Sequence, residues 1–275
     1  MSTYEERINR GFKINEKNGV VYFTIPSFEE LGFIKHGFSS RIGGVSTDGQ
    51  KSLNMSFSRE KIPGNVQKNF GIFADTLGFD VNDVVICHYE HGINIERADV
   101  CHKGMGIFRE NELPFCDGLV IDKKGICAAT LHADCTPIFY ADKKGRVCGV
   151  CHAGWKGIYS GVFGSIVKKL AEYGAEPGDV IFGLGPSIKK CCFEVKEDVA
   201  SLFRERFGEE LVILRDGKMF VDLLKACLIQ LEELGVPAEN VTASELCTSC
   251  NDELFYSYRR DKKDTGAHAS VIMFR

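Results

Sequence analysis

A cysteine and a histidine stand at the beginning and the end of a chain segment that is predicted to form a β-hairpin. Cys135 precedes a buried-type apolar run over residues 136–141, and His152 closes a second run over residues 147–151. The turn between them, residues 142–145, contains a glycine, which favours two antiparallel strands. In that pairing Cys135 and His152 come to the same end of the hairpin. A thiolate beside an imidazole suits either a metal site or a nucleophile–base pair.

The residues after His152 predict a helix that begins directly at the strand end. Apolar residues recur every four positions over residues 158–170, which predicts a helix over residues 158–173. Gly154, Gly157 and Gly161 stand at its start. Free backbone N–H groups at such a start can face an anion.

A second polar segment lies earlier in the chain. Ser39 and Arg41 follow a predicted strand and enter a glycine loop at residues 42–46, and Asn54 comes shortly afterwards. Glycine lets backbone N–H groups approach a ligand, and arginine offers a bidentate fork, so this segment predicts an oxyanion cradle. An ordinary surface turn is the alternative interpretation.

A short predicted strand over residues 84–87 delivers a further histidine. His88 and His91 lie three positions apart, so on a strand they would point to opposite faces. His91, which precedes a glycine, is the candidate ligand. A lone histidine of this kind is more often structural.

Twelve cysteines accompany a chain long enough to bury a large core. The charged N-terminal residues 1–18 do not read as a signal sequence, so most of the thiols should be reduced. Cys191 and Cys192 are adjacent and cannot easily bridge each other. Cys247 and Cys250 have the CxxC spacing of a zinc or redox motif, but no second CxxC accompanies them, which argues against that interpretation.

Composition excludes several classes of partner. The net charge of -4 and the pI near 6.0 give no basic face for nucleic acid. No apolar stretch approaches the roughly 18 residues needed to span a bilayer. We therefore expect a cytoplasmic protein that binds neither nucleic acid nor membrane.

The density of short apolar runs predicts the fold class. Runs and turns alternate from residue 116 to residue 151, helices follow, and strand signals return at residues 255–258 and 270–274. No repeat or flexible linker divides the chain. We predict an α/β (mixed α+β) fold in one domain over residues 1–275, with mixed or antiparallel sheets packed together and flanked by helices. Residues 1–19 are expected to form a poorly ordered N-terminal extension.

Several motifs in a fixed order resemble the YfiH/YlmD laccase-domain family, formerly called multicopper polyphenol oxidases. The likeness runs from about residue 20 to the C-terminus. It rests on HGFSSRIGGVS (36–46), SLN (52–54), ADCTP (133–137), HAGWKG (152–157), GPSI (185–188), CCFEV (191–195), CT (247–248) and SYRRD (257–261).

The resemblance implies a ligand set and an activity. In the family a histidine after a strand, the cysteine of ADC and the histidine of HAGW bind one metal, which here implies His91, Cys135 and His152 as metal-binding and catalytic residues. The metal is generally zinc. Copper is less expected, because a multicopper oxidase needs more histidine clusters than seven scattered histidines supply. Family members act on purine nucleosides by phosphorolysis of adenosine, inosine and methylthioadenosine and by deamination of adenosine.

The chain departs from the family pattern at three places. Tyr89 and Glu90 replace the residues before the first ligand, His132 precedes ADC, and the family's TGR ends in Ala267. Ala267 removes an arginine that could hold an anion. His132 is a potential fourth ligand that could close an open metal site, although alternation along a strand would point it away from Cys135.

The expected partners are purine nucleosides and phosphate, with the chain as a monomer or homodimer. Phosphorolysis needs donors that hold phosphate under the ribose. The predicted donors are Ser39, Arg41, Asn54 and Arg260.

Two other functions stay open. Cys135 could be a nucleophile with His152 as its base, as in a cysteine hydrolase or deamidase, which a distant likeness of the family fold to the cytotoxic necrotising factor toxins supports. Alternatively, the chain could be a metal-binding module without turnover.

Overall fold

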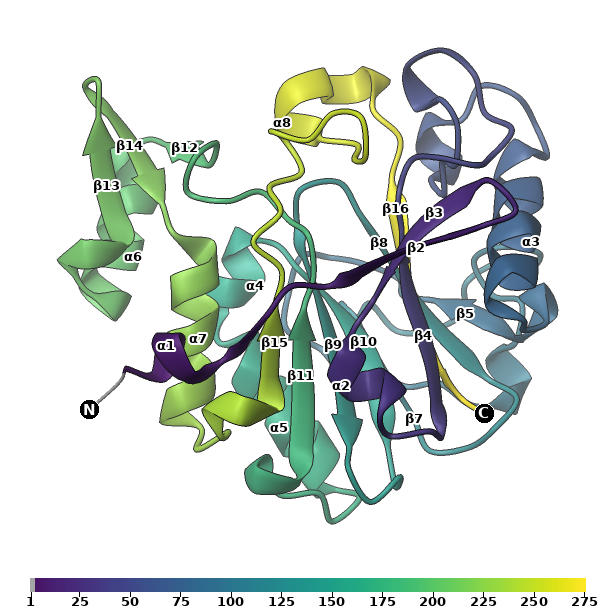
Figure 1. Cartoon of the computed structure of the whole chain (residues 1–275), viewed down its shortest axis with the longest axis horizontal. Coiled ribbons are helices and arrows are strands. Elements are labelled where there is room, and N and C mark those ends of the chain that lie inside the picture. The colour runs from purple at the N-terminus through teal and green to yellow at the C-terminus, as the bar shows by residue number, and fades with distance from the viewer. Residues whose placement is uncertain (1–2) are drawn as a thin grey trace.

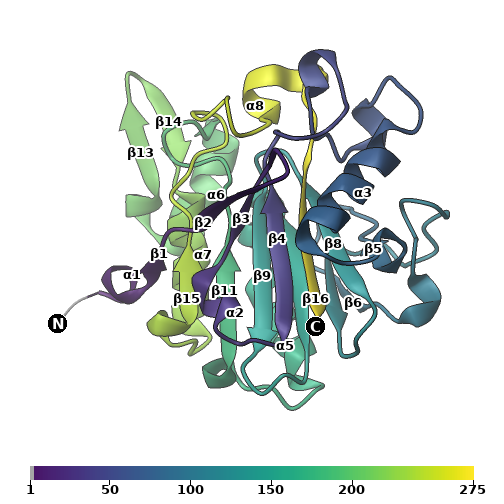
Figure 2. The ribbon, with the colours of Figure 1, turned by 45° about the vertical axis from the view of Figure 1, so that its right-hand side comes forward.

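Two large β-sheets form the centre of the computed structural model, which describes residues 3–275 (Figures 1 and 2). In this range a seven-stranded sheet has the order β1-β15-β11-β9-β10-β7-β6. Its strands are β1 (Asn9–Arg10), β6 (Ile95–Arg97), β7 (Gly118–Ile121), β9 (Thr136–Asp142), β10 (Cys148–Ala153), β11 (Val180–Leu184) and β15 (Val241–Ala243).

The second large sheet has six strands within the described range, in the order β2-β3-β4-β16-β8-β5. Both sheets mix parallel and antiparallel pairs, as predicted. The strands of this sheet are β2 (Lys13–Lys17), β3 (Val20–Thr24), β4 (Ile34–Ser39), β5 (Val84–Ile86), β8 (Cys127–His132) and β16 (His268–Phe274).

Helices cover the outer faces of the two sheets. Helices α4 (Trp155–Ser160), α5 (Val162–Ala171) and α7 (Leu223–Glu233) pack on the seven-stranded sheet, and α3 (Asn65–Leu77) packs on the six-stranded one (Figure 1). Helix α6 (Glu197–Phe207) supports a small sheet of β12 (Glu194–Val195), β14 (Lys218–Val221) and β13 (Val212–Arg215) at one side of the molecule. Short helices α1 (Tyr4–Arg7), α2 (Pro26–Glu29) and α8 (Tyr258–Asp261) complete the set of α-helices in residues 3–275.

The core explains why the central strands are apolar on both faces. Along β9, Phe139 points into the cluster between the two sheets, whereas Ile138 and Tyr140 point into the cluster under the helices. Successive side chains of a strand point to opposite faces, and here both faces are covered. An uninterrupted apolar run therefore marks a strand between two layers.

The hairpin around the two candidate site residues is confirmed. Strands β9 and β10 are antiparallel, with Thr136 opposite Ala153 and Pro137 opposite His152. Cys135 and His152 therefore lie at the same end of the hairpin. The predicted helix that follows is not continuous, because Gly161, with φ 89°, ends α4 and begins α5.

Two further segments differ from expectation. The predicted strand over residues 255–258 is wrong, because this segment leads through Ser257, whose side chain caps α8, into that helix. Residues 3–19, expected as a poorly ordered extension, carry α1, β1 and β2, and β1 pairs with β15. The Tyr4 hydroxyl donates to the Val236 carbonyl oxygen, which fixes α1 against the domain. Residues 1–2 lie outside the described range.

Within residues 3–275, none of the helices has both the length and the apolar composition that crossing a membrane requires.

Candidate metal centre and substrate pocket

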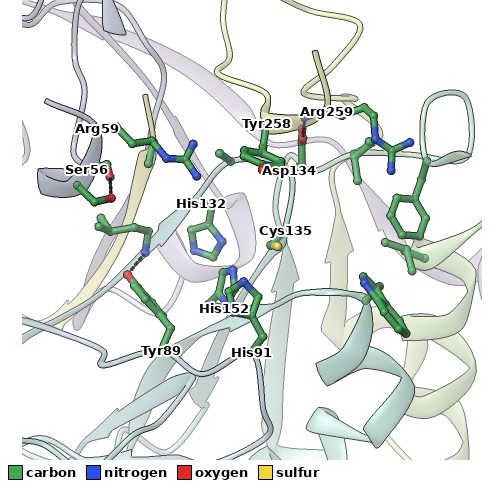
Figure 3. A pocket seen from close by; sticks show the side chains of 18 of the residues that line it. Ser56, Arg59, Tyr89, His91, His132, Asp134, Cys135, His152, Tyr258 and Arg259 are labelled. Atoms are coloured by element: carbon green, nitrogen blue, oxygen red, sulfur yellow. Dashed lines mark hydrogen bonds between the residues drawn. The ribbon is translucent and has the colours of Figure 1, made fainter. Parts of the chain in front are cut away.

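The three residues implied as metal ligands converge. His91 lies in the loop after β5, Cys135 in the turn between β8 and β9, and His152 near the end of β10. One ligand atom from each lies within 4.8 Å of the other two. Two imidazoles and a thiolate at this spacing are a suitable donor set for one ion with bonds of about 2.0–2.3 Å. The group lies at the floor of a pocket, with Arg59 and Tyr258 on the opposite side (Figure 3).

A buried carboxylate joins two of these ligands. Asp117, at the start of β7, accepts hydrogen bonds from the backbone N–H groups of His91 (3.0 Å) and Gly92 (2.6 Å). Its Oδ1 also lies 3.3 Å from Nδ1 of His152. A carboxylate on one ring nitrogen leaves the other nitrogen to face a metal, and fixes the direction of the ring. Sequence reasoning missed Asp117, whose only local signal is an acidic residue directly before a buried strand.

The charges in this group shift its pKa values. Burial alone would raise the pKa of Asp117, but the hydrogen bonds from His152 and Gly92 outweigh burial and lower it. Burial alone would lower the pKa of His152, yet the nearby Cys135 and Asp117 raise it to about 9. Burial, together with the neighbouring His152, lowers the pKa of His91. Of the two histidines, His152 is therefore the one whose positive charge the surrounding residues favour in the metal-free site.

The turn that carries Cys135 is fixed by its neighbour. Asp134 has φ 87°, a conformation that costs a non-glycine residue about 1–3 kcal/mol. Its carboxylate accepts hydrogen bonds from the Thr248 hydroxyl (2.6 Å) and the Arg259 backbone N–H (2.6 Å). Its carbonyl oxygen accepts from the Ile188 N–H (2.9 Å). Three contacts from three distant segments hold the strained turn in place.

Two glycines of the HAGWKG motif allow neighbouring segments to approach the start of α4 closely. A Cβ at Gly154 would lie 3.4 Å from both the Cys135 sulfur and a carbon of the His91 ring. A Cβ at Gly157 would lie 2.8 Å from the Gly92 carbonyl oxygen. Helix α4 has only six residues, and its first turn packs against the His91 loop.

His132 lies beside the ligands without belonging to the group. Its ring centroid is 5.3 Å from that of His152, and its Nε2 lies 2.8 Å from the Thr130 hydroxyl. Burial lowers the pKa of His132 well below its usual value, so the ring is neutral. Its Nδ1 is buried without a hydrogen-bond partner among residues 3–275. His132 and Cys135 line the same pocket. Strand alternation predicted that the two side chains would point in opposite directions. The prediction is wrong because the chain turns at Asp134, between them, and does not continue as a strand.

The predicted phosphate donors do not line the pocket. The Ser39 hydroxyl accepts from the Ala269 N–H, and Asn54 Oδ1 accepts from the N–H groups of Ser56 and Ala267. Ser39 therefore links β4 to β16, and Asn54 joins its own loop to the segment before β16.

The two predicted arginines have similar roles. Arg41 donates to the carbonyl oxygens of Lys51 and Asp252 and lies over the Tyr256 ring. Arg260 donates to backbone oxygens at residues 248, 249 and 255 and pairs with Asp261. Their guanidinium groups organise the loops around the site.

A different arginine faces the pocket. Arg59 lies with its guanidinium carbon 5.3 Å from the Tyr258 ring centroid. Its Nη1 is buried, and within residues 3–275 this atom has no hydrogen-bond partner. The pocket has a volume of about 730 Å³ and combines polar residues near Arg59 with an apolar wall. Its other lining residues include Ser56, Phe57, Ser58, Trp155, Ile188, Phe193, Leu223, Arg259 and Ala267.

Two departures from the family pattern now have a structural description. The Tyr89 hydroxyl accepts a 2.6 Å hydrogen bond from the Leu131 N–H, so this residue supports the pocket floor from below. Ala267 lines the pocket directly. The site therefore lacks a guanidinium at position 267 and has one at Arg59.

Comparison with known proteins decides the family. The model of the family described as multi-copper polyphenol oxidoreductase laccase matches residues 35–275. The chain belongs to this laccase-domain family. The resemblance expected from the sequence motifs is confirmed.

Relatives and solved structures of the laccase-domain family agree with this assignment. YlmD of Geobacillus stearothermophilus, named a purine nucleoside phosphorylase, is 32% identical over 86% of this chain and 88% of its own. Its crystal structure has a TM-score of 0.87 and 30% identity, covering 96% of this chain and 98% of that one. Bacillus licheniformis YfiH also gives 0.87 at 28% identity, covering 96% and 99%.

A mammalian laccase-domain relative is longer than this chain. Mus musculus LACC1, also named a purine nucleoside phosphorylase, is 32% identical over 87% of this chain. The match spans only 55% of the mouse protein.

With zinc as the probe metal, we predict that Asp117→Asn weakens metal binding by about 10–100-fold, because the amide no longer orients His152 or matches both backbone N–H groups. Competition with a chelator measures the affinity. Asp122→Asn, at the other end of β7 and paired with Arg97, is the matched control and should bind zinc normally. Unchanged affinity in Asp117→Asn would contradict the orienting role.

The affinity for zinc should rise with pH between 7 and 9. Without a metal, His152 is protonated below its pKa of about 9, and zinc binds only the neutral ring. Each pH unit below 9 therefore costs at least about tenfold in apparent affinity. Chelator competition at several pH values, corrected for protonation of the chelator, checks this. An affinity independent of pH would show that His152 is already neutral.

Proposed function

We propose that the protein is a zinc-dependent purine nucleoside phosphorylase that also deaminates adenosine. The observation that carries the proposal is the placement, on opposite sides of one pocket, of three grouped metal-ligand residues and the guanidinium of Arg59, which forms no ion pair within residues 3–275. The names of the relatives support the phosphorolytic activity. The substrates we assign are adenosine, inosine and methylthioadenosine, together with phosphate.

The donor set supports zinc as the metal. Two neutral imidazoles and one thiolate suit zinc, and three protein ligands leave one position open for catalysis. Zinc bound by His91, Cys135 and His152 would supply Lewis acidity, which in deamination activates water toward purine C6. Asp117 keeps His152 in the required direction throughout.

Phosphorolysis makes a different demand on the residues. A phosphate oxygen forms a bond to the ribose C1′, the bond from C1′ to the purine nitrogen breaks, and the base leaves with that electron pair and takes up a proton. The phosphate must be held against C1′ while this occurs. Arg59 lines the pocket, and its guanidinium is the donor group we assign to the phosphate oxygens, with the Ser56 and Ser58 hydroxyls beside it.

The remaining lining residues suit a nucleoside. Tyr258 and Trp155 present aromatic surface to the pocket, which can cover the faces of a purine. His132 is neutral, and its ring lines the pocket beside the metal-ligand group. We therefore assign His132 to substrate binding rather than to the metal.

One observation favours a second function, that of a cysteine hydrolase or deamidase. Cys135, His152 and Asp117 stand in the order nucleophile, base and orienting carboxylate. In that mechanism the thiolate attacks a carbonyl carbon, and His91 has no required role. The position of His91 beside the other two ligands favours the metal.

Removal of the Arg59 guanidinium should separate the two activities. We predict that Arg59→Gln raises the phosphate concentration for half-maximal inosine cleavage by about 10–100-fold, the effect of losing a charge-assisted hydrogen bond. Deamination of adenosine should hardly change, because water replaces phosphate. Arg109→Gln, an exposed arginine outside the pocket lining, is the control. Equal loss of both activities would assign Arg59 a structural role.

Alkylation distinguishes a metal ligand from a free nucleophile. With zinc bound, we expect Cys135 to resist iodoacetamide, because its thiolate is coordinated; after zinc removal it should react. Exposed Cys101 is an internal reference that should react equally in both states. Peptide mapping gives the modified residue. Rapid labelling of Cys135 in the zinc-loaded protein, with loss of activity, would favour the hydrolase instead.

A further inference from the structure

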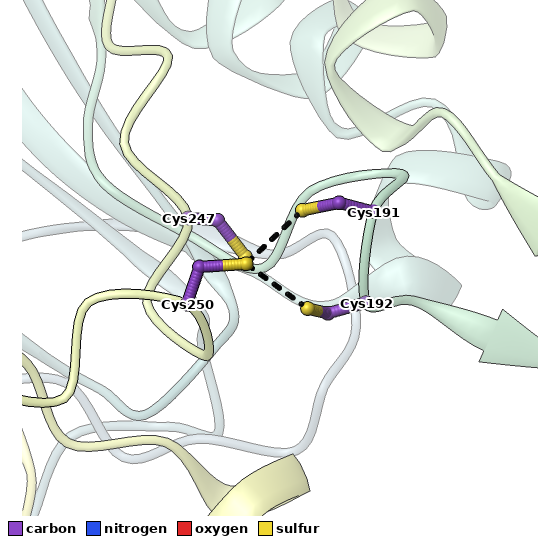
Figure 4. Close-up of side chains that lie close together, drawn as sticks. All are labelled: Cys191, Cys192, Cys247 and Cys250. Carbon is purple, nitrogen blue, oxygen red and sulfur yellow. Dashed lines mark hydrogen bonds between the residues drawn. The ribbon is translucent and has the colours of Figure 1, made fainter.

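Four cysteines from two distant segments meet outside the pocket. Cys191 and Cys192 lie in the loop between β11 and β12, and Cys247 and Cys250 lie in the loop after β15. Figure 4 shows the two pairs facing each other. All four sulfur atoms lie within 4.8 Å of one another, with Cys250 Sγ 3.5 Å from Cys191 and 3.3 Å from Cys192.

These separations match a single tetrahedral metal ion. Zinc–sulfur bonds of about 2.3 Å place neighbouring sulfurs about 3.8 Å apart at the edges of a tetrahedron. Burial in an apolar core does not explain the cluster, because Cys191 and Cys250 are exposed. The CxxC pair lacks a second CxxC in the sequence, and the fold supplies the missing two thiols from the adjacent Cys191 and Cys192.

We propose that Cys191, Cys192, Cys247 and Cys250 hold a second, structural zinc ion. Four sulfur ligands close the coordination shell, which is typical of structural rather than catalytic zinc, and an all-sulfur tetrahedral site favours zinc or iron. The oxygen and nitrogen ligands that other divalent metals prefer are not part of the cluster. This site is separate from the group at His91, Cys135 and His152.

The surroundings of the cluster carry the charge that such a site needs. Four thiolates around Zn²⁺ have a net charge of −2. The Lys189 backbone N–H points at the Cys247 sulfur over 3.5 Å. Arg215 donates to the Cys191 carbonyl oxygen, and Arg259 donates to that of Cys192. Positive side chains therefore hold the backbone of both adjacent cysteines.

The ion would join two segments that build the pocket wall. Ile188 and Phe193 flank the first pair of cysteines and line the pocket. Thr248, between the second pair, donates to the Asp134 carboxylate that fixes the Cys135 turn. Arg260 donates to the carbonyl oxygens of Thr248 and Ser249. The second zinc would thus stabilise the geometry of the pocket without contacting substrate.

Metal content of four proteins tests the proposal. Elemental analysis and native mass spectrometry of chain purified without chelator should give two zinc ions per chain for the wild type. Cys135→Ala should keep one, bound by the four cysteines. Cys250→Ser should also keep one, at the other site. Cys101→Ser, which removes an exposed cysteine outside both groups, should keep two.

X-ray absorption on Cys135→Ala provides a test that leaves the four cysteines intact. It should show zinc with four sulfur neighbours, and removal of that zinc by a strong chelator should lower the melting temperature. A metal-free Cys135→Ala protein, iron in place of zinc, or a shell containing nitrogen or oxygen would overturn the proposal. So would a disulfide among the four cysteines in protein that retains its single zinc at His91, Cys135 and His152.

Discussion

The buried carboxylate of Asp117 is the constraint on which the metal centre depends. Taking a carboxylate out of water costs several kcal/mol unless donors replace the lost hydration. For Asp117, hydrogen bonds from two backbone N–H groups of the His91 loop and from the ring of His152 replace that hydration. Its own carbonyl oxygen also accepts from the His152 N–H at 2.7 Å. Moving any one of these partners would leave the buried carboxylate with too few hydrogen-bond donors. The His91 loop and strand β10 are therefore held in a fixed position relative to each other.

Local patterns in the sequence were sufficient to place Cys135 and His152 together. Pairing within a hairpin depends only on two apolar runs and the turn between them, and all of these are contiguous. Strands β7, β8 and β16 were visible for the same reason, since their residues are mostly apolar and almost all buried, whereas the exposed β2 and β13 were not predicted. The break at Gly161 was not, because helix periodicity continues through it while the backbone adopts a positive φ.

Asp117 and Arg59 could not be found in this way. Their roles depend on residues far away in the chain, and nothing local separates them from other acidic or basic residues. Arg41 and Arg260 illustrate the opposite error. A motif containing arginine and glycine suggests an anion site, yet here backbone carbonyl oxygens use up the guanidinium donors. Only the accounting of partners in the folded chain distinguishes a structural arginine from one available to a ligand.

The hydrogen-bond partners of the two pocket arginines, Arg259 and Arg59, also differ. Arg259 donates to the carbonyl oxygens of Cys192 and Glu194, so its charge is directed away from the substrate side. Arg59 stacks on Tyr258, and burial lowers its pKa, but no carboxylate of residues 3–275 forms an ion pair with it. Asp134 favours the charged form of Arg59, but this offsets only part of the cost of burying the guanidinium. An anion bound beside Arg59, such as the proposed phosphate substrate, would recover the rest of this cost, so the same feature that weakens the empty site would strengthen anion binding.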